Sequence, residues 1–88
     1  STFTIAAILH DLNQSQKAER LLKKYVLSSD KHLALMTINY LIYSDHKSSF
    51  IEVIEKVYAR ETDDYNTSAA SKDFLGSLGL VPNNFDYK

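Results

Sequence analysis

The sequence predicts an all-α fold, a compact bundle of four to five short helices. The 88 residues include only two glycines and one proline, too few turn formers for a multi-stranded sandwich or barrel. Apolar residues instead recur every three or four positions in several segments, which is the spacing of amphipathic helices. Because a chain of this length is expected to hold one hydrophobic core, we predict a single helical domain over residues 1–82 and a C-terminal tail over 83–88. No internal repeat is visible in the sequence.

The first two helices are predicted at about residues 4–12 and 15–27. Asn13 and Gln16, three positions apart, resemble a capping pair that would start the second of them. Each helix has one apolar side that is expected to face the core. In the first helix that side holds Ile5, Ile8, Leu9 and Leu12, and in the second it holds Ala18, Leu21, Leu22, Tyr25 and Val26.

The most apolar stretch, LALMTINYLIYS at residues 33–44, is predicted to be the central helix of the bundle, at about 31–43. Its apolar residues also alternate, so a buried strand is the competing interpretation. The length favours a helix, because strands usually have about 5 to 6 residues. A membrane-spanning helix would need about 20 apolar residues, and here Thr37 and Asn39 interrupt an already shorter stretch, so we do not expect it to cross a membrane.

As a helix, this stretch has two apolar sides rather than one, since successive residues are about 100° apart. Either neighbouring helices cover both sides, as for a central core helix, or one side binds a partner. Tyrosine and methionine, which partner-binding surfaces favour, lie on the second side. The first side holds Ala34, Leu35, Ile38, Leu41 and Ile42, and the second holds Leu33, Met36, Tyr40 and Tyr43.

Two further helices are predicted after the central one. Ser49 and Glu52 form a capping-box pattern in front of an apolar run, so the fourth helix is expected to start at Ser49. A fifth helix is expected to end at Gly79, which can adopt the left-handed conformation that closes a helix. The fourth helix would bury Phe50, Val53, Ile54 and Val57, and the fifth Ala70, Phe74 and Leu78.

The composition offers little support for catalysis. The chain has no cysteine, 10 basic and 11 acidic residues, and no glycine-rich phosphate loop. His10, His32 and His46 are isolated, whereas a helical metal site would have two histidines four positions apart. We therefore expect no enzyme activity, cofactor or metal. The start STFTIAAIL lacks the basic region of a signal peptide, and cysteine-free chains fit a reducing compartment, so we expect a cytoplasmic protein.

The function that the sequence favours is that of a non-catalytic protein-interaction module, either an adaptor or a regulatory domain. The succession of LLKKY (21–25), a central helix and SSFIEVIEKVYA (48–59) is similar to small helical adaptor modules over about half the chain, a resemblance that implies protein binding. The partner would be another protein or a second copy of this chain. The residues expected to contact it are Leu33, Met36, Tyr40, Tyr43, Phe50 and Tyr58.

An alternative function uses a basic face on the second helix. Lys17, Arg20 and Lys24 are three and four positions apart, so they share one side and could contact nucleic acid or an acidic partner. Nucleic acid is the less favoured ligand, because the formal net charge is only −1. Such a face is also what many amphipathic helices show to water. A third possibility is that the chain is a structural piece of a larger protein without a binding role of its own.

Overall fold

The computed structural model describes residues 2–13, 15–45, 47–60 and 64–80. These residues form helices and no strand, which confirms the predicted all-α class. The prediction of a tail over 83–88 lies outside the described residues. The helices are α1 (Thr2–Asn13), α2 (Gln16–Val26), α3 (Lys31–Ile42), the short 3₁₀ helix η1 (Ser48–Phe50), α4 (Ile51–Ala59) and α5 (Tyr65–Ser77).

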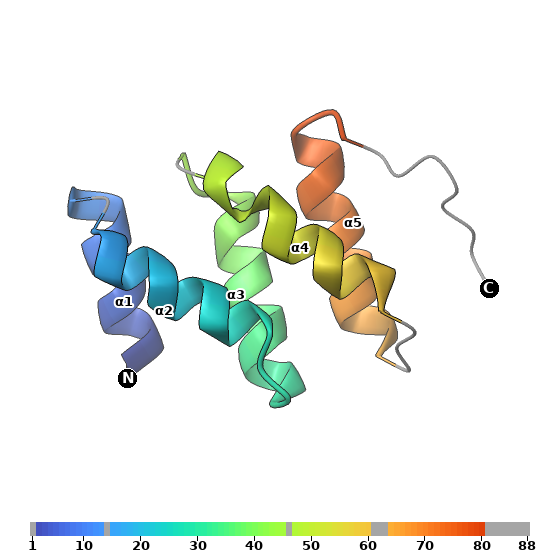
Figure 1. The fold of residues 1–88 in the computed structure, drawn as a ribbon, viewed down its shortest axis with the longest axis horizontal. Coiled ribbons are helices and arrows are strands. Elements are labelled where there is room, and N and C mark those ends of the chain that lie inside the picture. The colour runs from blue at the N-terminus through green and yellow to red at the C-terminus, as the bar shows by residue number, and fades with distance from the viewer. Residues whose placement is uncertain (1, 14, 46, 61–63, 81–88) are drawn as a thin grey trace.

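The helices are arranged in two layers (Figure 1). In the view shown, α1, α3 and α5 form the back layer and run in the same direction, while α2 and α4 cross in front of them. Helix α2 packs against α1 and α3, α4 packs against α5 and α2, and α3 packs against α5. Helix α3 is therefore central, as the sequence predicted, with neighbours on both sides and in front.

One hydrophobic core lies between the two layers. It is formed where the apolar sides of the front helices meet the inner sides of the back helices. Phe50 and Phe74 are the largest side chains without exposed surface in it. The other buried members are Ala6, Leu22, Val26, Ile38, Leu41, Val53, Ile54, Val57, Ala70 and Leu75.

The buried positions of the back helices recur at one spacing. In α1 they are Ala6, Ala7 and His10; in α3 they are Ala34, Thr37, Ile38 and Leu41; in α5 they are Thr67, Ala70, Ser71, Phe74 and Leu75. The front layer follows the same rule, since Ala18 and Leu22 in α2 correspond to Phe50 and Ile54 in the η1–α4 segment. These buried positions have the spacing that is typical of amphipathic helices.

The prediction for the apolar side of α1 is wrong. Ile5, Ile8 and Leu9 are exposed, whereas Ala6 and Ala7 face the interior, and the Leu12 side chain lies outside the described part. Both sets of residues have helical spacing, so periodicity alone does not choose between them. Small residues let the axes of packed helices approach closely, and in α1 the alanines hold the contact side while the bulky aliphatic side chains face outwards.

Two of the predicted helix starts also differ in the structure. Helix α1 continues through Asn13, and Ser15 caps α2 by accepting a hydrogen bond from the Ala18 N–H (3.3 Å). The capping box at Ser49 is not formed, because no side chain caps η1 or α4. Its N-cap would need extended backbone, but η1 brings the chain into α4 in a helical conformation and places Phe50 in the core.

The predicted end of the last helix is confirmed. Gly79 has φ +74°, in the left-handed region that favours glycine. The Leu80 N–H donates to the Leu75 carbonyl (2.8 Å) and the Gly79 N–H donates to the Gly76 carbonyl (3.0 Å). This pair of hydrogen bonds is the Schellman motif, and it closes α5.

Candidate functional site

The structure separates the six residues predicted to bind a partner. Phe50 has no exposed surface and so is not available to a partner in this fold. Leu33, Tyr40 and Tyr58 are half-buried. Of the six, Met36 and Tyr43 are well exposed, at 37% and 86%.

Helix α1 covers the middle of the predicted stripe on α3 by packing against Tyr40. The Tyr40 ring meets the ring of Phe3 edge-on, with centroids 6.0 Å apart. Its hydroxyl donates to Asp11 Oδ1 (2.6 Å) and lies 3.1 Å from His10 Nδ1 and 3.2 Å from the Ala7 carbonyl oxygen. Burial, followed by this hydrogen bond to Asp11, raises the pKa of the Tyr40 phenol above its ordinary value. Tyr40 is therefore a contact between two helices of the same chain.

An open hollow of about 410 Å³ lies beside this contact and is lined by Asp11, Tyr40, Tyr43, Ser44 and Asp45. Its two carboxylates do not form part of a metal-binding cluster: nowhere in the described ranges do three or more potential His, Cys, Asp or Glu ligands come together. None of the helices formed by the described residues has the length and hydropathy needed to span a bilayer.

The outer side of α1 carries the densest group of exposed aliphatic side chains in the described parts of the chain. Ile5, Ile8 and Leu9 are 59%, 51% and 41% exposed. The other large exposed apolar residues are distributed over different segments of the chain: Leu27, Met36, Tyr43, Tyr65 and Leu80. Since side chains three and four positions apart on a helix lie together, the three α1 residues form one continuous apolar surface.

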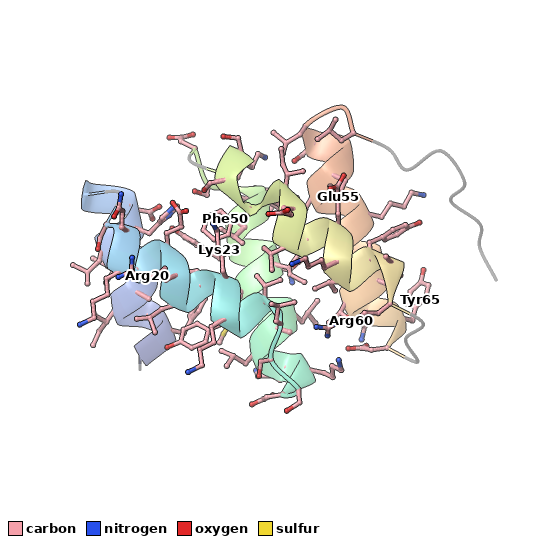
Figure 2. All side chains as sticks on the ribbon, viewed as in Figure 1. Arg20, Lys23, Phe50, Glu55, Arg60 and Tyr65 are labelled. Carbon is pink, nitrogen blue, oxygen red and sulfur yellow. The ribbon has the colours of Figure 1, made fainter. Side chains whose placement is uncertain are left out.

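The basic residues of α2 divide into two groups. Lys23 forms an ion pair with Glu19 (3.0 Å), and its Nζ lies 5.8 Å from the centre of the Phe50 ring. The hydrogen bond from Lys23 lowers the pKa of the Glu19 carboxyl, against the opposing effect of partial burial. Lys17, Arg20 and Lys24 are exposed. Figure 2 shows Arg20 near the α1 end of the molecule and Lys23 beside Phe50.

Helices α1 and α2 pack against each other, and α1 and the Arg20 side chain of α2 lie at the same end of the molecule (Figures 1 and 2). We call this surface the α1–α2 end face and define it by Ile5, Ile8, Leu9, Lys17, Arg20 and Lys24. The sequence predicted the basic residues but assigned the aliphatic ones to the core. The signal for their exposure was the adjacent pair Ala6 and Ala7, which fits a close helix contact.

Comparison with family models, with curated proteins and with solved structures found no match to this chain.

Proposed function

We propose that this chain is a non-catalytic protein-interaction module that docks a partner through the α1–α2 end face. The observation that carries this proposal is the outward position of Ile5, Ile8 and Leu9, which are 59%, 51% and 41% exposed. Contiguous exposed apolar surface in a small domain marks an interaction site more often than single exposed residues do. An adaptor or regulatory role and a cytoplasmic location are part of the proposal.

The aliphatic side chains of this face keep apolar surface that a partner would cover. Fully covering one large aliphatic side chain stabilises by roughly 1.5 to 3 kcal/mol. The three residues of α1 keep about half of their surface exposed, and the interior contacts of α1 are made by Phe3, Ala6, Ala7 and His10. A partner can therefore cover the outer side without any change in how α1 packs on the rest of the fold.

The exposed part of the α3 stripe supports a secondary contact. Tyr43 and Met36 flank Tyr40 on α3 and are exposed, whereas Tyr40 itself is held by α1. A tyrosine or methionine side chain offers adaptable contact area at an interface. We therefore keep Tyr43 and Met36 as candidate contact residues, separate from the end face.

Nucleic-acid binding through Lys17, Arg20 and Lys24 is the second candidate function. It is favoured by the exposure of all three side chains on α2. The net charge of −1 gives no general attraction to phosphate, and this function would leave the aliphatic side of α1 unused. For these reasons we rank it below protein binding.

Site-specific photocrosslinking in cells tests the proposed function. A photoreactive amino acid at position 8 is expected to form a covalent adduct of defined mass with a partner protein, and the adduct is expected to disappear when Leu9→Asp is added. The control carries the same amino acid at position 65, because Tyr65 is also exposed (75%) but lies on α5 at the other end of the molecule (Figure 2). No adduct at position 8, or equal labelling at both positions, would contradict the proposal.

A further inference from the structure

We infer that the open hollow lined by α1 and the end of α3 binds an alkylammonium or guanidinium group, supplied by a lysine or arginine side chain or by a free amine. This site is separate from the α1–α2 end face, so the inference goes beyond the proposed function. Three observations support it: the two aromatic rings of the hollow, its two carboxylates, and the place of the neighbouring lysine.

The hollow lies at the C-terminal ends of two helices. Asp11 belongs to the last turn of α1, and Tyr43, Ser44 and Asp45 follow directly after α3. Because α1 and α3 run in the same direction (Figure 1), both C-terminal ends are on this side of the molecule. The C-terminal end of a helix carries a partial negative charge, which favours a cation. The volume of about 410 Å³ is within the range of about 300–1,000 Å³ that is usual for ligand sites.

Two tyrosine rings form the aromatic part of the hollow. The Tyr43 N–H donates to the Tyr40 carbonyl (3.2 Å), so the helical turn continues and places both residues on one side of the chain. Tyr40 is held by Phe3 and Asp11 of α1, whereas Tyr43 is 86% exposed. Since a cation is attracted to the face of an aromatic ring, the exposed ring of Tyr43 can make this contact.

The two carboxylates give the hollow its charge. Asp11 accepts the Tyr40 hydroxyl, which leaves the carboxylate without a cationic partner. Within residues 2–13, 15–45, 47–60 and 64–80, the ion pair that forms joins Glu19 and Lys23, and neither Asp11 nor Asp45 takes part in one. No lysine or arginine is among the described residues that line the hollow. Its charge therefore complements a cation from outside this chain.

Lys47 is close to Asp45 in the sequence but lies on the other side of α3. Its Nζ donates to the Ile42 carbonyl (2.7 Å) and to Ser77 Oγ (2.8 Å), and it is 5.9 Å from the centre of the Phe74 ring. These last two contacts belong to α5, which is on the side of α3 away from α1 (Figure 1). The Lys47 ammonium is thus bound to the α3–α5 contact and does not occupy the hollow.

The lining favours an organic cation over a metal ion. Calcium takes about 6–8 oxygen ligands, and the described residues bring no three potential protein ligands together here. A guanidinium or ammonium group needs fewer partners, because one or two carboxylates and an aromatic ring can bind it. The hollow offers both kinds of group.

Butylguanidinium and butylurea, added to the full chain, test whether binding needs a positive charge. The two molecules have the same shape, but only butylguanidinium is charged. We expect butylguanidinium to shift the backbone amide NMR signals of residues 43–45 saturably, in the millimolar range. We expect butylurea to shift them at least fivefold less, and calcium chloride to produce no saturable shift.

Two pairs of variants locate the site. Asp45→Asn is expected to weaken butylguanidinium binding at least threefold, whereas Glu55→Gln, which removes the same charge from the exposed side of α4 (Figure 2), should leave it unchanged. Tyr43→Leu is expected to weaken binding to a similar extent, and Tyr65→Leu, which removes an exposed ring from α5, should have no effect. Circular dichroism checks that each variant is folded, which is expected because all four side chains are exposed.

Two short peptides distinguish the sources of the cation. Both consist of glycine and serine around one central residue, which is arginine in the first and citrulline, its uncharged isostere, in the second. Binding of the arginine peptide alone, with shifts of the same amides, assigns the hollow to a basic side chain of another protein. Binding of butylguanidinium but of neither peptide assigns it to a free amine.

Four results would overturn the inference. These are the absence of saturable shifts with butylguanidinium, equal shifts with butylurea, and butylguanidinium binding that Asp45→Asn and Tyr43→Leu leave intact. The fourth is a saturable shift of the same amides by calcium chloride, which would make the hollow a metal site. None of them bears on the α1–α2 end face, because photocrosslinking at position 8 tests the proposed function separately.

Discussion

Tyr40 connects the first and third helices through a single hydroxyl group. The hydroxyl donates to Asp11 Oδ1 (2.6 Å) and the ring meets Phe3 edge-on. His10, with 1% of its surface exposed, lies on the other side of this contact and packs its ring edge-on against Phe50 at 5.4 Å. A polar group that is partly removed from water must keep its hydrogen bond. The position of α1 is therefore tied to the protonated form of Tyr40.

This dependence predicts a loss of stability in alkali. Burial and the hydrogen bond to Asp11 raise the folded-state pKa of Tyr40 above its ordinary value of 10.0. Its contribution to stability is thus complete below about pH 10 and decreases as the pH rises above that value, because the unfolded chain then ionises more readily. Urea unfolding between pH 8 and 11 should show a steeper decrease for the wild type than for Tyr40→Phe. Parallel pH profiles for the two proteins would contradict this assignment.

Ser71 is a second residue whose chemistry affects stability. It is fully buried in α5, and among the described residues its hydroxyl has no hydrogen-bond partner. A buried hydroxyl without a partner is unfavourable by about 1–3 kcal/mol. Apolar residues take the matching buried positions of the other back helices, Ala7 in α1 and Ile38 in α3, so the packing does not require a polar side chain there.

Ser71→Ala is accordingly expected to stabilise the fold by about 1 kcal/mol, because it removes the unpaired hydroxyl and favours the helix. Thr37→Val is the comparison: Thr37 is also buried, but its hydroxyl donates to the Leu33 carbonyl (2.8 Å), so its removal should bring no gain. Thermal unfolding of both variants measures the difference. A destabilised Ser71→Ala protein would show that the hydroxyl does have a stabilising partner.

Among the helices, α3 and α5 each begin directly after a residue with extended backbone. Asp30 is extended (φ −75°, ψ 101°) and its side chain accepts hydrogen bonds from the His32 and Leu33 N–H groups. Asp64 caps α5 in the same way through the Asn66 N–H. Ser49 lies inside η1, so its hydroxyl cannot take the capping position that its sequence pattern suggests, and it hydrogen-bonds instead with Glu19.

Alanine substitutions distinguish the real cap from the apparent one. Asp30→Ala should destabilise the protein by about 1 kcal/mol, because it leaves the first amides of α3 without a partner. Ser49→Ala should change stability by less than about 0.5 kcal/mol, since it removes only a surface contact. Denaturant titrations provide both values. Equal losses for the two variants would indicate that Ser49 supports the start of α4 after all.

At the scale of the whole molecule, the two-layer stack determines which apolar residues are covered. Helix α3 has back-layer contacts on both sides, through Tyr40 towards α1 and by packing against α5. Helix α1 has such a contact on one side, and Ile5, Ile8 and Leu9 face outwards on the other. The exposed aliphatic surface is therefore a property of the end of the stack.

These positions predict that alanine substitution of two isoleucines has very different effects on the free energy of unfolding. Ile38→Ala should destabilise by about 2–5 kcal/mol, because Ile38 is fully buried and its loss leaves a cavity. Ile8→Ala should change stability by less than about 0.5 kcal/mol, because half of that side chain is in water. Denaturant unfolding of the isolated chain supplies the comparison. A large loss for Ile8→Ala would mean that the end face is covered within this chain.

Features that depend on neighbouring residues could be predicted from the sequence. The scarcity of turn-forming residues and the helical spacing of apolar residues predicted the all-α class and the central place of α3. Gly79 predicted the end of α5. These features follow from local backbone preferences and from one periodic pattern, so they can be inferred without knowing which helices meet.

The side of α1 that faces the core and the division of the α3 stripe depended instead on contacts between helices. Ile5, Ile8 and Leu9 have the same helical spacing as the inward Ala6, Ala7 and His10, so the choice depended on how closely α1 can approach α2 and α3. Tyr40 was assigned to a partner, yet Asp11 and Phe3 of the same chain hold it. The side of α1 that faces the core and the role of Tyr40 depend on shape and hydrogen bonding between segments far apart in the sequence. The periodicity of one segment carries no information about either.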